Sequence, residues 1–337
     1  MNVRKQALLE FLEIPNTQLV IPVYQRVYSW TQRQCEVLWG DVVRAGKEQR
    51  EHFAGVVLCA QEAESWGCFG RLRIIDGQQR CTTLTLLLIA IRNALDSGAL
   101  GVEGLCARDL DRRYLRAGSG DDAPCKLVLS HLDRCTLATL VDGGAMPDEH
   151  SARLVENLRF FEEKLAQPGL DAGALWRGLQ RLTAATALLD GAEDPQAIFE
   201  SLNSRGLPLT AADLVRNALL FGEGEGERRV LYERCWRPLE EGLAGVPGAT
   251  MDGLVRAWLA ARFRDERVRS DADVYGVLRE YLRVSGCGVG ELLDELARFG
   301  SRSAGDEEWR AQADRSAREW LEDKPRATVG EFKLFGD

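Results

Sequence analysis

Five consecutive residues, Asp-Gly-Gln-Gln-Arg at 76–80, combine side chains that suit phosphate chemistry. They lie between a short apolar segment, Leu72–Ile75, and a long apolar segment that begins at Cys81. Polar residues between two strongly apolar elements are costly to place unless they line a pocket. The sequence therefore predicts a binding site at this segment.

Each residue type in this segment has a chemical use. The free backbone N–H groups of a helix that begins here favour a bound phosphate. Gly77 lets the backbone turn close to a ligand, Arg80 can donate to two phosphate oxygens, and Asp76 can hold Mg²⁺ or a water. The predicted catalytic residues are Asp76, Gln79 and Arg80, and the predicted binding residues are Gly77, Gln78 and Thr82. The structural alternative is that Asp76 only caps the helix and Gly77 completes the turn.

A second segment, Ile21–Trp30, gathers aromatic and polar side chains within ten residues. Aromatic rings beside an amide and a guanidinium suit the binding of a nucleobase and its phosphates. The predicted binding residues are Tyr24, Gln25, Arg26, Tyr28 and Trp30. In the alternative interpretation, the aromatic rings fill the edge of a core and the arginine forms a structural ion pair.

A third segment, Ile198–Asn217, contains a predicted helix break followed by a new helix start. Thr210 and Asp213 have the spacing of a helix N-cap and its partner, and Asp213 and Asn217 share one helix face. The predicted binding residues here are Asn203, Arg205, Asp213 and Asn217. Capping and a helix-helix turn explain Thr210 and Gly206 but leave Asn203 and Asn217 without a role.

Short strands and helices must position these segments. Apolar, partly β-branched runs predict strands at Leu19–Ile21, Phe53–Cys59 and Leu72–Ile75. Helical spacing predicts helices at Thr31–Ala45, with Thr31 as the N-cap, and at Cys81–Leu95. The remaining predicted helices are Leu127–Leu140, Ser151–Ala166, Gly173–Leu189, Pro195–Leu202, Ala211–Phe221, Glu227–Glu241, Met251–Phe263, Asp271–Val284 and Gly290–Phe299. The predicted fold class is α+β, with a small mixed core in residues 1–95 and a large, mostly α-helical region in residues 96–337.

The charge balance restricts the partners. The 337 residues include 43 basic and 52 acidic side chains, which gives a net charge of −9. Such a chain is not wrapped in nucleic acid over its whole surface, but residues 1–95 carry 11 basic and 9 acidic side chains and can contact DNA locally. The absence of a GxxxxGK[ST] sequence excludes a P-loop NTPase. Nine scattered cysteines without a CxxC pair predict reduced thiols and a cytoplasmic location, and no apolar run is long enough to span a membrane.

The three segments together resemble the N-terminal domain of the GmrSD-type restriction proteins, which are similar to the ParB and sulfiredoxin fold. The shared patterns are, in chain order, IPxYQRxYxW, IDGQQR followed by TTL, and FExLNxRGxPLxxxDLxRN. This resemblance implies a ParB/sulfiredoxin-like core and hydrolysis of an NTP, with GTP as a candidate. It implies that residues 76–80 contact the phosphates, that residues 24–30 form the adjoining wall, and that residues 203–217 close the pocket.

The resemblance also implies a role in antiviral restriction that responds to DNA modification, which is phosphorothioate in some relatives. Full-length members carry a C-terminal HNH nuclease, whose chemistry requires histidine. The last histidine of this chain is His150, so no HNH site is expected here. We therefore expect an N-terminal fragment, or a chain that works with a separate nuclease subunit. The partner predictions are DNA, a nuclease domain or subunit, and a second copy in a homo-oligomer, with no membrane.

Three functions compete at this point. In the leading one, an NTPase sensor, Asp76 places Mg²⁺ or water, Arg80 and Arg26 neutralise phosphate charge, and Gln79 orients the attacking water. The second is a non-enzymatic module that binds DNA or modified DNA, for which binding should weaken steeply with salt. The third is a ParB-like DNA nickase, which ranks last because no acidic cluster with nuclease spacing is present.

Overall fold

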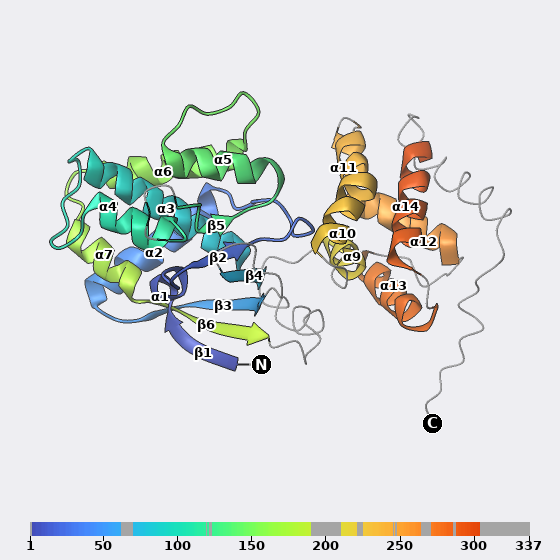
Figure 1. Cartoon of the computed structure of the whole chain (residues 1–337), viewed down its shortest axis with the longest axis horizontal. Coiled ribbons are helices and arrows are strands. Elements are labelled where there is room, and N and C mark those ends of the chain that lie inside the picture. Colours follow the sequence, from blue (N-terminus) through green and yellow to red (C-terminus); the bar gives the residue numbers. More distant parts are fainter. Residues whose placement is uncertain are drawn as a thin grey trace. The chain divides into compact units, whose positions relative to one another are not determined.

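The computed structural model describes residues 2–61, 70–118, 120, 123–189, 210–220, 225–244, 246, 248–263, 271–285 and 288–303. The chain divides into two compact units, Met1–Ser204 and Arg205–Asp337. All strands of the described residues belong to the first unit, and the second unit is helical (Figure 1). The α+β class is therefore confirmed. The expected boundary after residue 95 falls inside the first unit, because the last strand of that unit's sheet comes much later in the chain.

A mixed sheet forms the base of the first unit. Its strands in the described residues are β1 (Asn2–Ala7), β2 (Thr17–Val20), β3 (His52–Gln61), β4 (Gly70–Asp76), β5 (Leu127–Val128) and β6 (Leu182–Leu189), in the order β1-β6-β3-β4-β2-β5. Strand β2 is parallel to both β4 and β5, whereas β3 is antiparallel to β4. The carboxyl ends of β2, β4 and β5 therefore lie at the same edge of the sheet.

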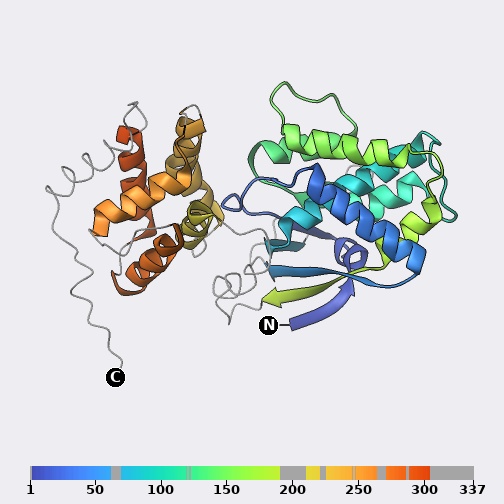
Figure 2. The same ribbon diagram turned by 180° about the vertical axis from the view of Figure 1, so that it is seen from behind.

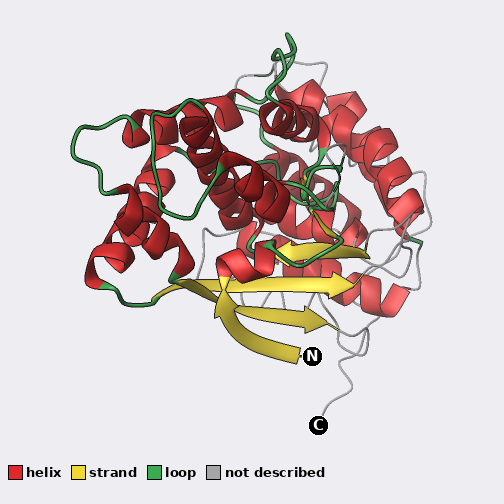
Figure 3. Cartoon of the chain, turned by 60° about the vertical axis from the view of Figure 1, so that its left-hand side comes forward, coloured by secondary structure: helices red, strands yellow, loops and turns green. Residues whose placement is uncertain are grey.

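Helices of the first unit lie on one side of this sheet (Figures 1, 2 and 3). They are α1 (Leu8–Leu12), α2 (Gln32–Glu48), α3 (Gln78–Asp96), α4 (Ala107–Leu110), α5 (His131–Asp142), α6 (Ala152–Leu165) and α7 (Ala172–Gln180). A π-helical turn, Asp111–Leu115, continues α4. The predicted cap of α2 is confirmed, since Gln34 Oε1 accepts the Thr31 N–H at 2.8 Å in a capping box.

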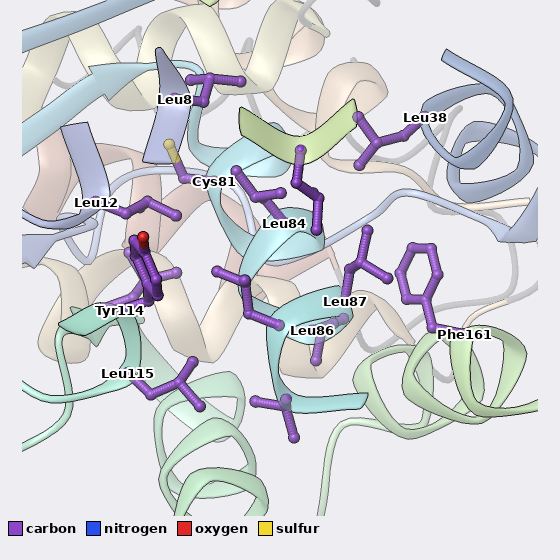
Figure 4. Packing of buried hydrophobic residues seen from close by; sticks show 14 of the residues in the cluster. Leu8, Leu12, Leu38, Cys81, Leu84, Leu86, Leu87, Tyr114, Leu115 and Phe161 are labelled. Atoms are coloured by element: carbon purple, nitrogen blue, oxygen red, sulfur yellow. The ribbon is translucent and has the colours of Figure 1, made fainter. Parts of the chain in front are cut away.

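Helix α3 is the centre of the core. Its residues from Cys81 to Ile91 are all buried, as the apolar sequence on every face of this helix predicts. Figure 4 shows Leu84, Leu86 and Leu87 of α3 surrounded by side chains that other helices contribute. Because α3 is packed on all sides, its N-terminus has a fixed position relative to the sheet.

Helices α2 and α7 pack with their backbones in contact. A Cβ atom on Gly46 would lie 1.9 Å from the Ala174 carbonyl oxygen, and one on Gly178 would lie 1.9 Å from the Val42 carbonyl oxygen. No side chain larger than hydrogen fits at either glycine without moving a helix. The two glycines therefore allow the backbones of α2 and α7 to pack in direct contact.

The predicted helix Gly173–Leu189 is wrong in its second half. The helix ends at Gln180, and Leu182–Leu189 forms β6, which pairs in parallel with β3 and antiparallel with β1. Its sequence is rich in alanine and leucine, which favour helix, but partners on both sides satisfy its backbone in the sheet. The predicted helix Leu127–Leu140 likewise begins later than expected, because Leu127–Val128 is a strand. The predicted helix Pro195–Leu202 lies outside the described residues.

The second unit is a cluster of helices. They are α9 (Ala211–Leu220), α10 (Glu225–Leu231), α11 (Arg237–Ala244), α12 (Met251–Phe263), α13 (Asp271–Ser285) and α14 (Val289–Ser303), with a π-helical turn at Tyr232–Trp236. Trp236 and Trp258 are its largest fully buried side chains. In the described parts of the chain, none of the helices combines the length and the apolar content that a membrane crossing requires.

Candidate functional site

The site lies at the carboxyl ends of the parallel neighbours β2 and β4. The segment Ile21–Trp30 follows β2, and Asp76 ends β4 directly before Gly77 and α3. Ligands of open α/β sheets characteristically bind outside the carboxyl ends of such strands. The structure therefore brings the first two predicted segments together, although they are separated by more than 40 residues in the sequence.

Gly77 makes the turn from β4 into α3. Its φ is +91°, and a Cβ atom there would lie 3.1 Å from both Val56 O and Val57 Cγ2. Both the conformation and the close approach favour glycine. Gly77 is also the N-cap of α3, and it has no side chain that could cap the helix. The Asp76 carboxyl bonds to the Gly77 backbone at this N-terminus, as the structural alternative expects.

Glutamines connect the two segments. The Gln79 Oε1 accepts the backbone N–H groups of Ser29 at 2.8 Å and Trp30 at 3.3 Å, and its Nε2 donates to Val27 O at 3.2 Å. Gln25 Nε2 donates to the carbonyl oxygen of Ile75, at the end of β4. Gln79 is thus used in this structure to hold the loop that carries Trp30.

Gln78 and Thr82 are also engaged inside the fold. Gln78 Nε2 donates to Gln25 Oε1 at 3.3 Å, and Thr82 Oγ1 donates to the Gln78 carbonyl within α3 at 2.9 Å. Both side chains are buried. Their predicted contact with a ligand remains a prediction, while their observed contacts stabilise the start of α3.

Two further helices hold the same loop, and the sequence analysis did not select their residues. Asp133 of α5 accepts the Tyr28 N–H at 2.7 Å. Asn157 of α6 donates to Tyr28 Oη at 2.9 Å and to the Trp30 carbonyl oxygen at 2.8 Å. Both side chains are buried, and a polar residue at a core position of a helix is the only signal that marks them in the sequence.

The two predicted tyrosines are core residues in this structure. Tyr24 and Tyr28 are both buried, and the Tyr28 hydroxyl lies 2.7 Å from Thr83 Oγ1. Burial raises the pKa of Tyr28 far above its ordinary value. Trp30, in contrast, is half-buried and lines a pocket. Of the aromatic residues in this segment, Trp30 is therefore the one placed to contact a ligand.

Asp76, Arg80 and Arg26 form the charged part of the site. Burial raises the pKa of the Asp76 carboxyl, whereas the hydrogen bond with the Gly77 backbone and the charges of Arg80 and Arg26 act in the opposite direction. All three side chains are partly exposed. A carboxylate and two guanidinium groups beside a helix N-terminus form a setting that suits a phosphate group.

Arg80 is held by strand β3. Its Nη1 donates to Val56 O at 2.9 Å, and its guanidinium lies against Gly55, whose φ is +104°. The pairing of β3 with β6 shifts register between Phe53 and Val56, which is a local irregularity of the strand. Such bulges redirect side chains and occur next to active sites. Gly55 is a site residue that the sequence analysis missed.

The third predicted segment is divided between described and undescribed residues. Asn203 and Arg205 lie outside the described residues. On α9, Asp213 Oδ2 accepts the Thr210 N–H and Thr210 Oγ1 accepts the Asp213 N–H, so the predicted capping box is confirmed. Asp213 also pairs with Arg216 at 2.6 Å, and Asn217 is buried. Their predicted part in ligand binding stays a prediction.

A magnesium ion would have one protein carboxylate here. Among the described residues, no group of three or more His, Cys, Asp or Glu side chains could hold a metal. Mg²⁺ is commonly bound through one or two carboxylates together with the phosphates of a substrate. The partly exposed Asp76 beside two arginines fits that arrangement and does not fit an all-protein metal cage.

Comparison with known proteins finds a matching family for a large part of the chain. Residues 8–220 match the family model described as GmrSD restriction endonuclease, N-terminal domain. The match begins at α1 and extends through α9, so it includes all of the segments that form the candidate site. A search of curated proteins finds no match to the chain.

Proposed function

Since this chain belongs to the family of GmrSD restriction endonuclease N-terminal domains, we propose that its first unit binds and hydrolyses a nucleoside triphosphate as part of a restriction system. Membership of this family identifies the chain as a component of a restriction system. The observation that carries the proposal further is the grouping of Asp76, Arg80 and Arg26 beside the N-terminus of α3. Anionic phosphates are the ligands that this combination of charges and N–H groups favours.

Each residue has a defined part in the proposed reaction. Arg80 and Arg26 bind phosphate oxygens and neutralise charge that develops as the terminal phosphoryl group is transferred to water. Asp76 is the protein ligand of Mg²⁺, which supplies further neutralisation of the phosphates when it is bound. Gln79 is a positioning residue, because its hydrogen bonds fix the loop that carries Trp30.

We propose that nucleotide turnover is a signal. Because a restriction system acts on DNA, modified DNA is the proposed regulator of nucleotide turnover. The proposed target of the signal is a nuclease domain or subunit outside this sequence. A cytoplasmic location is consistent with these partners. A second copy of the chain is a further proposed partner.

Phosphate release tests this function directly. GTP, ATP, CTP and UTP are incubated with the protein and Mg²⁺, with and without modified and unmodified duplex DNA. We expect release from at least one nucleotide, lowered about 10²-fold or more in Asp76→Asn and in Arg80→Ala. Asp96→Asn, at the exposed far end of the same helix, and the exposed Arg134→Ala are the matched controls.

The same assay separates the competing functions. No release under any condition, together with DNA binding that weakens steeply with salt, would establish a recognition module without catalysis. Cleavage of DNA by the purified chain, lost in Asp76→Asn, would establish the nickase instead. Release that both site variants retain would place the hydrolytic centre elsewhere.

A further inference from the structure

A pocket of about 360 Å³ opens between α2 and the first residues of β3. Its volume falls within the range of pockets that hold small molecules. Arg80 forms one of its walls, so the pocket adjoins the charged group of Asp76, Arg80 and Arg26. None of the predicted site residues except Trp30 and Arg80 lines it.

Two aromatic side chains line this pocket. Phe53 is 57% exposed although it lies on a strand, at the residue where the register of β3 shifts. The backbone of Trp30 is fixed by two hydrogen bonds: its N–H donates to Gln79 Oε1, and its carbonyl oxygen accepts from Asn157 Nδ2. A flat aromatic ligand would cover the exposed ring of Phe53 by stacking on it.

Charged side chains of both signs also line the pocket. Arg33 is exposed on α2, and Arg80 is fixed by its bond to Val56 O. On the same pocket wall, Asp41 lies 3.3 Å from His52. Arg33 and Arg80 can pair with the phosphates of a nucleotide. The Asp41 carboxylate can accept hydrogen bonds from the N–H groups of its base.

We propose that this pocket binds the nucleobase of the triphosphate, with Arg80 at the junction between base and phosphates. The inference rests on the proposed function, because it takes the phosphates to lie at Asp76 and Arg80. Inorganic phosphate alone would leave Phe53 and Trp30 exposed, and a purely apolar ligand would form no ion pair with Arg33 or Arg80. A nucleotide satisfies both sets of groups.

The test measures binding without turnover. The imido analogues of GTP and ATP and inorganic tripolyphosphate are titrated into the wild type, Phe53→Ala, Phe53→Tyr and Arg80→Ala. Loss of base stacking should weaken both nucleotide analogues at least about tenfold in Phe53→Ala. Phe53→Tyr keeps an aromatic face and should bind nearly as tightly as the wild type. Tripolyphosphate affinity should be unchanged by either substitution of Phe53, whereas Arg80→Ala should weaken all three ligands.

A matched control excludes a general effect of truncating an exposed side chain. Val230, in the second unit, is 56% exposed, so Val230→Ala should bind every ligand as the wild type does. Photo-crosslinking with 8-azido-ATP, followed by mass spectrometry, should label peptides that contain Trp30 or Phe53. Label confined to other peptides would overturn the assignment of this pocket.

The outcomes distinguish this inference from the proposed function. If Arg80→Ala loses the nucleotide analogues but Phe53→Ala binds them normally, the phosphate site stands and the base pocket is wrong. If the wild type binds neither nucleotide nor tripolyphosphate, the proposed function itself fails, and the base pocket with it. If, in a parallel titration with duplex DNA, Phe53→Ala weakens only the binding of DNA, the pocket serves DNA and the nucleotide assignment is overturned.

Discussion

The guanidinium of Arg80 rests on the backbone of Gly55. Arg80 Nη1 donates to the Val56 carbonyl oxygen at 2.9 Å, and a Cβ atom on Gly55 would lie 2.8 Å from Arg80 Nη2. The missing side chain at Gly55 therefore makes room for the arginine. Through this contact, an irregularity in a strand determines where the site carries its positive charge.

Replacement of Gly55 tests this contact. Gly55→Ala should displace the Arg80 guanidinium and lower phosphate release about 10²-fold, because small displacements of a catalytic group have large effects on rate. The positive φ of +104° adds a conformational cost of about 1–2 kcal/mol. Gly98→Ala is the control, since Gly98 has a φ of +73° with no atom within 4 Å of its Cβ position. Equal loss of activity in both variants would contradict the specific role of Gly55.

Gln79 should act through the loop that it holds. Gln79→Ala removes hydrogen bonds to Val27, Ser29 and Trp30 and should lower the free energy of unfolding by about 1–3 kcal/mol. Hydrogen exchange should show faster exchange at the Ser29 and Trp30 amides. The control is Gln18→Ala, which removes a bond to Cys125 O outside the site. Unchanged exchange at both amides in Gln79→Ala would refute the positioning role.

The activity should depend on the ionisation of Asp76. Burial raises the pKa of this carboxyl, and the charges of Arg80 and Arg26 partly oppose that effect. The acidic limb of the pH–activity profile should therefore lie above the ordinary range of an aspartate, and Arg26→Ala should move it to still higher pH. The measurement is phosphate release across pH for the wild type and Arg26→Ala. A limb that moves to lower pH in Arg26→Ala would contradict the assignment.

The ionisation of Asp76 that favours activity should lower the stability of the folded protein. Because the folded-state pKa of Asp76 is raised, its contribution to stability is complete below the unfolded pKa and is lost as pH rises through the folded pKa. Asp76→Asn removes this dependence. In chemical unfolding, the difference in unfolding free energy between the wild type and Asp76→Asn should therefore shift in favour of the variant as pH rises. A difference that is constant with pH would show that Asp76 is not perturbed.

The α2–α7 crossing should tolerate no side chain at its closest point. Gly178→Ala would place a methyl group 1.9 Å from the Val42 carbonyl oxygen, so we expect a loss of about 3 kcal/mol or more in unfolding free energy. Gly40→Ala on α2 is the control, because no atom lies within 4 Å of that Cβ position. It should stabilise the protein slightly by favouring helix. Thermal unfolding of both variants measures the difference.

Local features of this protein can be predicted from short stretches of its sequence. The cap at Thr31, the apolar helix that begins after Gly77, and the capping box of Thr210 and Asp213 depend on neighbouring residues in the chain. Spacing and turn chemistry are visible in a short window of sequence, so these features could be predicted. The three segments that resemble the restriction family could be found for the same reason.

Contacts between residues far apart in the chain depend on the assembled fold. Residues 182–189 have the composition of a helix, yet they form β6 because β1 and β3 offer backbone partners on both sides. Asn157 reaches Trp30 across 127 residues of sequence, and Arg80 reaches Val56 across 24. Long-range pairing of strands and packing of helices bring such residues together, and no local pattern encodes those distances. The base pocket beside Arg80 belongs to this second class, since α2 and β3 form it only once the sheet is assembled.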